Sequence, residues 1–151
     1  MGCDIHMHVE YKEKGVWQNG NFYKKDGYGY ELVEFYGDRN YKLFAILADV
    51  RNYDCVKYIS EPKGFPDDAT EYVSLDYVRW GIDAHSCSYF TLKELIDFNE
   101  EHHYEELDHL IDALKARADD LYVIYDFMWK HDRERAYELS NNIRIVFWFD
   151  N

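Results

Sequence analysis

The sequence predicts an α+β fold in which a small mixed or antiparallel sheet contains both chain ends and helices pack on one of its faces. Three patterns lead to this expectation. Residues 4–12 alternate between polar and apolar side chains, residues 143–149 are apolar on both faces of a strand, and three stretches between them have helical periodicity. A strand that is apolar on both faces belongs inside a sheet, so we expect it to lie beside the opening strand. The length of 151 residues favours a single domain over 1–151.

The opening strand carries the most informative pattern of the chain. Its apolar side is formed by Cys3, Ile5, Met7 and Val9. Its polar side presents two imidazoles and two carboxylates in one row, from Asp4, His6, His8 and Glu10. Side chains two residues apart on a strand are roughly 6.5–7 Å apart at Cα, so His6 and His8 can converge on one ion. A turn at 13–15 is expected to return the chain through a short strand at 16–18.

Residues 22–37 are rich in tyrosine and glycine, and we expect an aromatic surface loop there. A lid that closes over a ligand is the alternative. The glycines around Tyr28 do not have the spacing of a nucleotide-binding loop.

A helix is predicted over 41–51, because the apolar residues Leu43, Ile46, Leu47 and Val50 recur with helical spacing. Asp38 or Asn40 is expected to cap its start, and Asn52 its end. Arg39 and Arg51 lie near its two ends. They are either surface ion-pair partners or a clamp for phosphate or carboxylate, and in the second case Arg39, Asn40, Tyr41 and Arg51 are ligand-binding candidates.

The pattern between residues 53 and 81 is weak, and both prolines lie in an expected loop at 60–68. Residues 72–78 fit either a strand or a helix. Trp80, which follows them, is a candidate for stacking on a base.

A second informative segment leads into a predicted helix over 92–103. Thr91 and Glu94 have the spacing of a capping box. We expect the preceding residues to form a loop at the helix N-terminus, where backbone N–H groups favour anions. This loop contains the carboxylate of Asp83, the imidazole of His85, the hydroxyls of Ser86 and Ser88, and the thiol of Cys87. A long amphipathic helix over 106–130, with a break near 118–120 left open, follows.

The composition excludes several function classes. A formal charge of −13 argues against binding along a nucleic-acid backbone and against an anionic membrane surface. No apolar stretch approaches the roughly 20 residues of a spanning helix, and no secretion signal is recognisable. Three cysteines without CxxC spacing fit a reducing cytoplasm. Solubility explains the acidity, and mimicry of DNA by an acidic interaction protein is an alternative.

Four blocks of the sequence resemble an uncharacterised family of small bacteriophage and bacterial proteins that begin Gly-Cys-Asp-Ile-His. The blocks are residues 2–6, 39–48, 83–95 and 146–151. The resemblance implies a phage or bacterial cytoplasmic protein with a role in the contest between phage and host defence, and it supplies no catalytic residue.

A shorter resemblance concerns chemistry. Asp4-x-His6-x-His8 is similar to the first-strand metal motif of amidohydrolases and PHP-type phosphoesterases. It implies that His6 and His8, with Asp4, bind a divalent metal such as zinc. Such an ion needs three or four ligands, and His85 is the expected further one, with Glu10, Asp83 and Cys87 as alternatives. The expected activity is then hydrolysis of a small phosphorylated or nucleotide substrate, with Asp4, Asp83 and His85 as catalytic candidates.

Without a metal, the same residues suit a non-catalytic nucleotide-binding protein that sequesters a signalling nucleotide. Trp80 and the tyrosine-rich loop would stack on the base, while Arg39, Arg51 and the helix start after Thr91 would bind phosphate. Ser86 and Ser88, in the loop before that helix, are further ligand-binding candidates. A metal-free nucleophile, Ser86 or Cys87 beside His85, is a third alternative, and self-association of the chain is left open.

Overall fold

The computed structural model describes residues 2–151. Its strands are β1 (Asp4–Glu13), β2 (Val16–Asn19), β3 (Phe22–Asp26), β4 (Gly29–Val33), β5 (His85–Thr91) and β6 (Ile143–Asp150). Its α-helices are α1 (Tyr41–Ala48), α2 (Glu71–Trp80), α3 (Leu92–His102), α4 (Glu105–Leu121), α5 (Tyr125–His131) and α6 (Arg133–Leu139). Two 3-10 turns, η1 (Gly81–Asp83) and η2 (Ser140–Asn142), precede β5 and β6.

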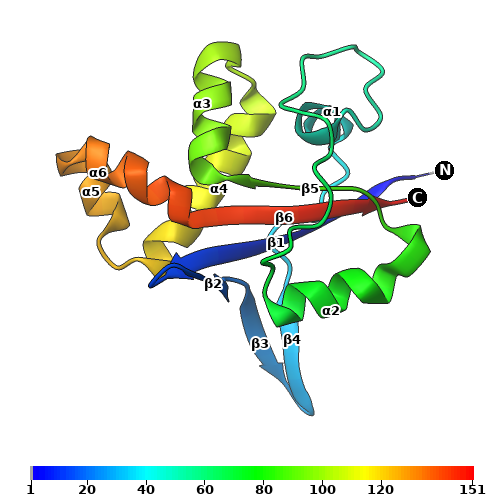
Figure 1. Cartoon of the computed structure of the whole chain (residues 1–151), viewed down its shortest axis with the longest axis horizontal. Helices are drawn as coiled ribbons and strands as arrows, with labels where there is room; N and C mark the ends of the chain where they lie inside the picture. Colours follow the sequence, from blue (N-terminus) through cyan, green and yellow to red (C-terminus); the bar gives the residue numbers. More distant parts are fainter. Residues whose placement is uncertain (1) are drawn as a thin grey trace.

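The predicted α+β fold with both chain ends in one sheet is confirmed (Figure 1). The main sheet has the order β2-β1-β6-β5, and all its neighbours are antiparallel. The central position of β6 explains its sequence, since a strand covered on both faces has no polar side. Every residue of β6 except the last is buried.

The larger core lies on the face of the sheet formed by the apolar side of β1. Ile5, Met7 and Val9 face Phe149, Phe147 and Ile145 across the β1–β6 pair, as their register requires. The expected helices α1, α3 and α4 cover this face, and Figure 1 shows them together on one side of the sheet.

Helix α2 covers the opposite face, where it forms a second, smaller core (Figure 1). Residues 72–78, which fit a strand or a helix in the sequence, are helical. Val73 and Tyr77 of α2 pack against Trp148 of β6, whose side chain is fully buried. The polar side of β1 therefore lies beneath a helix.

The segment 22–37, expected as a surface loop, instead contains the hairpin β3–β4, which forms a two-stranded sheet of its own. Asp26 accepts the backbone N–H groups of Tyr28 and Gly29 and so closes the turn. The hairpin projects away from the main sheet beside α2 (Figure 1). Most of its side chains are exposed, and this explains why the sequence lacks the alternation of a half-buried strand.

The helix boundaries follow local signals in part. Asn40 caps α1 and the Thr91–Glu94 capping box is present, as predicted. Helix α1 ends at Asp49 in the left-handed conformation, three residues before Asn52. The long helical stretch breaks after Leu121, close to the break near 118–120 that the sequence left open, and α6 is separate from α5. Residues 85–91, expected as a loop, form strand β5, because β6 offers them a pairing edge that no local pattern reveals.

Candidate functional site

The polar side of β1 was predicted to hold the functional site, and its central residue is His8, which is 2% exposed. Its Nε2 lies 2.8 Å from the carboxylate of Asp76 on α2, and its Nδ1 lies 3.0 Å from Nδ2 of Asn21. The Asn21 amide has a fixed orientation, because its Oδ1 accepts the N–H of Val9. Nδ2 therefore donates to Nδ1 of His8, and Nε2 carries the proton that it donates to Asp76. Both ring nitrogens of His8 are used.

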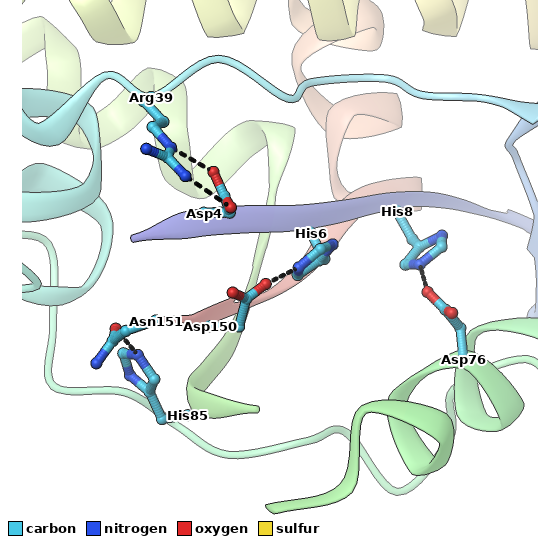
Figure 2. A network of polar contacts seen from close by, with 8 residues as sticks. All are labelled: Asp4, His6, His8, Arg39, Asp76, His85, Asp150 and Asn151. Carbon is cyan, nitrogen blue, oxygen red and sulfur yellow. Dashed lines mark hydrogen bonds and ion pairs between the residues drawn. The ribbon is translucent and has the colours of Figure 1, made fainter. Parts of the chain in front are cut away.

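His6 lies beside His8 on the same face and has partners of its own. Its Nε2 contacts the carboxylate of Asp150, and its ring packs against that of Trp80 with centroids 4.0 Å apart and the planes tilted by 33°. Figure 2 shows the two imidazoles directed to two different carboxylates, His6 to Asp150 and His8 to Asp76. Trp80, the candidate for stacking on a base, therefore packs against a side chain of the protein itself.

Asp4 is bound by Arg39 through two hydrogen bonds. Nε and one terminal nitrogen of Arg39 donate to the two carboxylate oxygens at 2.6 and 3.1 Å (Figure 2). The hydrogen bond from Arg39 lowers the pKa of Asp4 below its ordinary value. Asp4 and Arg39, predicted as a metal ligand and a phosphate ligand, instead satisfy each other at the exposed rim of the sheet.

His85 belongs to the other face of the sheet. It lies opposite Phe149 in the β5–β6 register, and the two rings are stacked. Phe149 in turn lies opposite Ile5 and belongs to the larger core, so His85 is on the face of that core. Its Nδ1 is 3.1 Å from Oγ of Ser86, and its Nε2 is 2.7 Å from Oδ1 of Asn151 (Figure 2). The cleft that we expected His85 to share with His6 and His8 is therefore not formed.

The residues predicted as metal ligands do not fit a shared ion. Within residues 2–151, no three side chains of histidine, cysteine, aspartate or glutamate are grouped closely enough to hold one. A metal at His8 would first have to displace Asn21 or Asp76, because both imidazole nitrogens are occupied.

The remaining predicted residues are dispersed. Asn40 caps α1, and the Tyr41 hydroxyl accepts the N–H of Cys3. A guanidinium nitrogen of Arg51 donates to the Tyr53 hydroxyl. Ser88 is buried and accepts the N–H of Lys63. Asp83 is exposed in η1. These side chains do not form one site.

The cysteine of the predicted nucleophile is poorly suited to attack. Cys87 is buried in the second core, and burial raises the pKa of its thiol to about 12. The thiolate is the reactive form, so this side chain stays protonated and unreactive near neutral pH.

A groove that was not anticipated lies between helices α3 and α4 on one side and α5 and α6 on the other. Two adjoining hollows of about 490 and 740 Å³ make it up, within the range of ligand sites. Both are lined by Asp112, Lys115, Trp129 and Arg133.

Two cations meet over one indole in this groove. Nζ of Lys115 lies 4.2 Å and the guanidinium carbon of Arg133 lies 5.9 Å from the centroid of Trp129. Burial lowers the pKa of Lys115. The charge of Asp112 opposes this effect, the charge of Arg133 adds to it, and Asp108 opposes it to a smaller extent. No salt bridge to either cation is found in the described part of the chain. An anion placed here would relieve the repulsion between the two cations.

The groove also carries acceptors. The carboxylates of Glu100, Asp108 and Glu134 line its first hollow, together with His103 and Tyr137. A ligand that fits must therefore combine an anionic group for Lys115 and Arg133 with N–H donors for the carboxylates.

Sequence reasoning missed this groove because its residues come from four helices. Lys115, Trp129 and Arg133 each look like an ordinary residue of an amphipathic helix. Trp129 and Arg133 are four residues apart in the sequence, but Asp132 interrupts the helix between α5 and α6, so helical spacing gives no signal for the groove.

The comparisons with known proteins give no functional guide, since no family model, curated protein or solved structure has a significant match to the chain. Within the described residues, no helix is both long and apolar enough to cross a membrane.

Proposed function

We propose that the protein is a non-catalytic binding protein for a small phosphorylated ligand of the nucleotide class, which it holds in the groove between α3–α4 and α5–α6. The observation that carries this proposal is the pair of cations, Lys115 and Arg133, placed over Trp129 without a carboxylate partner in a chain of charge −13. Carboxylates such as Asp112 line the same groove, but within residues 2–151 none of them lies within ion-pair distance of either cation.

The chemistry of the lining supports a nucleotide more than a simple anion. A phosphate is suited to Lys115 and Arg133, since charge-assisted hydrogen bonds to these groups are strong. The exocyclic amines and ring N–H groups of a base are suited to the carboxylates of Glu100, Asp108 and Glu134. Binding without catalysis is supported by the histidines of β1, which are committed to partners within the chain.

The test is a thermal-shift and calorimetry series on the purified protein with AMP, GMP, cyclic AMP, cyclic GMP and dinucleotides, with inorganic phosphate and adenosine as half-ligands. A ligand that binds only the folded state stabilises it by about 2.7 kcal/mol at 100 times its Kd. We expect at least one nucleotide to raise Tm by about 5–10 °C, and each half-ligand to give less.

The matched variants are Lys115→Gln with Arg133→Gln, and Lys57→Gln with Arg135→Gln as a control. Lys57 and Arg135 are exposed and lie outside the groove, so both pairs remove two positive charges. We expect the first pair to weaken binding about tenfold or more, because each charged hydrogen bond contributes roughly 1.5–3 kcal/mol. Equal losses in both pairs, or no stabilisation by any nucleotide at millimolar concentration, would overturn the proposal.

A further inference from the structure

The outer face of α2 is an apolar stripe that the rest of the chain leaves uncovered. Leu75 is 58% exposed, Val78 72%, and Ile82, in η1 directly after the helix, is fully exposed. The spacing of three residues places Leu75 and Val78 on one face of α2, and Ile82 follows in the turn beyond the helix end. The inner face of the same helix holds Val73 and Tyr77 in the second core, so Leu75 and Val78 are apolar residues on the side turned away from it. A continuous apolar stripe on a surface helix is typical of an interaction site.

The stripe continues onto the β3–β4 hairpin. The ring of Tyr72 on α2 meets the ring of Tyr23 on β3 edge to face, with centroids 5.5 Å apart. Tyr23 and Tyr30 are exposed on the hairpin, which projects beside α2 (Figure 1). The helix alone would give less than the roughly 800 Å² per partner of a standard interface, and the hairpin provides additional surface.

The charges on this stripe are self-complementary. Glu71 lies four residues before Leu75, and Arg79 lies four residues after it. Both therefore flank Leu75 on the same face, one at each end of α2. When two α2 helices are placed antiparallel about a two-fold axis at Leu75, Glu71 of each copy faces Arg79 of the other, and Val78 faces Tyr72. In such an isologous contact every pair of residues occurs twice, once on each side of the two-fold axis. The Glu71–Arg79 and Val78–Tyr72 pairs satisfy this condition.

We infer that the uncovered face of α2 is the dimer interface of this protein, with a second copy of the chain as its occupant. Neither Glu71 nor Arg79 forms an ion pair in the described part of the chain, so both are available to a partner. A face that binds a basic protein should carry acids at both ends. This face carries one acid, Glu71, and one base, Arg79, which favours a second copy of the chain.

The test is the molar mass in solution, measured by sedimentation and light scattering over a range of concentrations. We expect the wild type to be a dimer at micromolar concentration. Glu71→Arg alone and Arg79→Glu alone should each weaken the dimer about tenfold, because like charges then face each other at both ends of the contact. The double variant with both changes restores opposite charges and should recover the wild-type association.

This rescue separates the inference from a defect in folding, since a damaged helix would not be repaired by a second substitution eight residues away. Leu75→Lys, at an exposed position, should give a folded monomer by circular dichroism. A wild type that stays monomeric at 100 µM would overturn the inference. So would a double variant that associates no better than the single variants, because the dimer would then use another surface. The groove is not involved, so nucleotide binding is measured separately and its failure would leave this result unchanged.

Discussion

At the scale of single residues, the polar row of β1 shows how neighbouring strand positions can be separated by their partners. His6, His8 and Asp4 share one strand and have the spacing of metal ligands, yet each has a different counterpart in Asp150, Asp76 and Arg39. The counterparts come from β6, from α2 and from the segment before α1. What resembles a metal motif in the sequence serves here to attach three parts of the chain to the first strand.

Asp76 is the residue whose removal tests this interpretation. Asp76→Ala leaves the buried N–H of His8 without an acceptor, and we expect a loss of about 1–3 kcal/mol in the free energy of unfolding at pH 7. Urea denaturation measures the loss. Asp83→Ala removes an exposed carboxylate from the adjacent turn η1 and should cost less than about 0.5 kcal/mol.

The stability that Asp76 contributes should also depend on pH. The hydrogen bond from His8 lowers the pKa of Asp76 in the folded protein, although burial opposes it. A carboxyl whose folded-state pKa is depressed contributes stability above its unfolded pKa of about 3.9, and this stability is lost as pH falls through the folded value. The difference between wild type and Asp76→Ala should therefore be constant from pH 7 to about 5 and shrink below pH 4. A difference that does not change with pH would show that the carboxylate charge has no part in it.

At the scale of elements, helices α2 and α3 both have a threonine at the N-cap position, but only one of these threonines caps its helix. Thr91 of α3 accepts the N–H of Glu94, and the Glu94 side chain accepts the N–H of Thr91. Thr70 of α2 makes no side-chain cap, and its hydroxyl is buried without a partner. Helix α2 is instead held at its start by the N–H of Thr70, which donates to Glu10 at 2.6 Å.

This contrast provides a matched comparison. Thr91→Ala removes a cap and should lower the free energy of unfolding by about 1 kcal/mol, within the usual range of 0.5–2 kcal/mol. Thr70→Ala removes an unpartnered buried hydroxyl and should be neutral or stabilising, since no hydrogen bond is lost. Chemical denaturation of both variants decides the point. Equal losses would indicate that the threonine methyl, not the capping hydroxyl, carries the stability.

At the scale of the whole molecule, one buried ion pair joins the two ends of the chain. Arg144 of β6 and Glu10 of β1 are 3% and 0% exposed, and Nε of Arg144 donates to Glu10 at 2.8 Å. The other oxygen of Glu10 accepts the N–H of Thr70, and Arg144 also reaches Asp68 at 3.0 Å. The pair therefore anchors the loop before α2 as well as the two central strands.

Arg144→Met leaves the carboxylate of Glu10 buried without its counter-charge, and we expect a loss of about 3–5 kcal/mol in the free energy of unfolding. Arg144→Met combined with Glu10→Leu removes both charges and should recover much of this loss, because an apolar pair of similar volume needs no counter-charge. Urea denaturation of the single and double variants measures the recovery. A double variant less stable than the single one would mean that the hydrogen bond from Thr70 to Glu10 contributes more to stability than the pairing of Glu10 with Arg144.

The sequence by itself determined the elements whose signals are local. The alternation in β1, the apolar run of β6, the cap at Asn40 and the capping box at Thr91 each lie within a few residues, and a few residues suffice to set the conformation of one strand or one helix turn. These patterns also placed the two chain ends in one sheet, because β6 required neighbours on both sides.

The tertiary structure alone decided which side chains meet. Strand β5 formed where the sequence indicated a loop, because its pairing partner is more than fifty residues away. Helix α2 covered the polar side of β1 and supplied Asp76 to His8, so the expected metal face became a buried contact. The groove over Trp129 combines residues of four helices. A site depends on distances between segments, which local periodicity does not encode, whereas an element depends on its own period and ends.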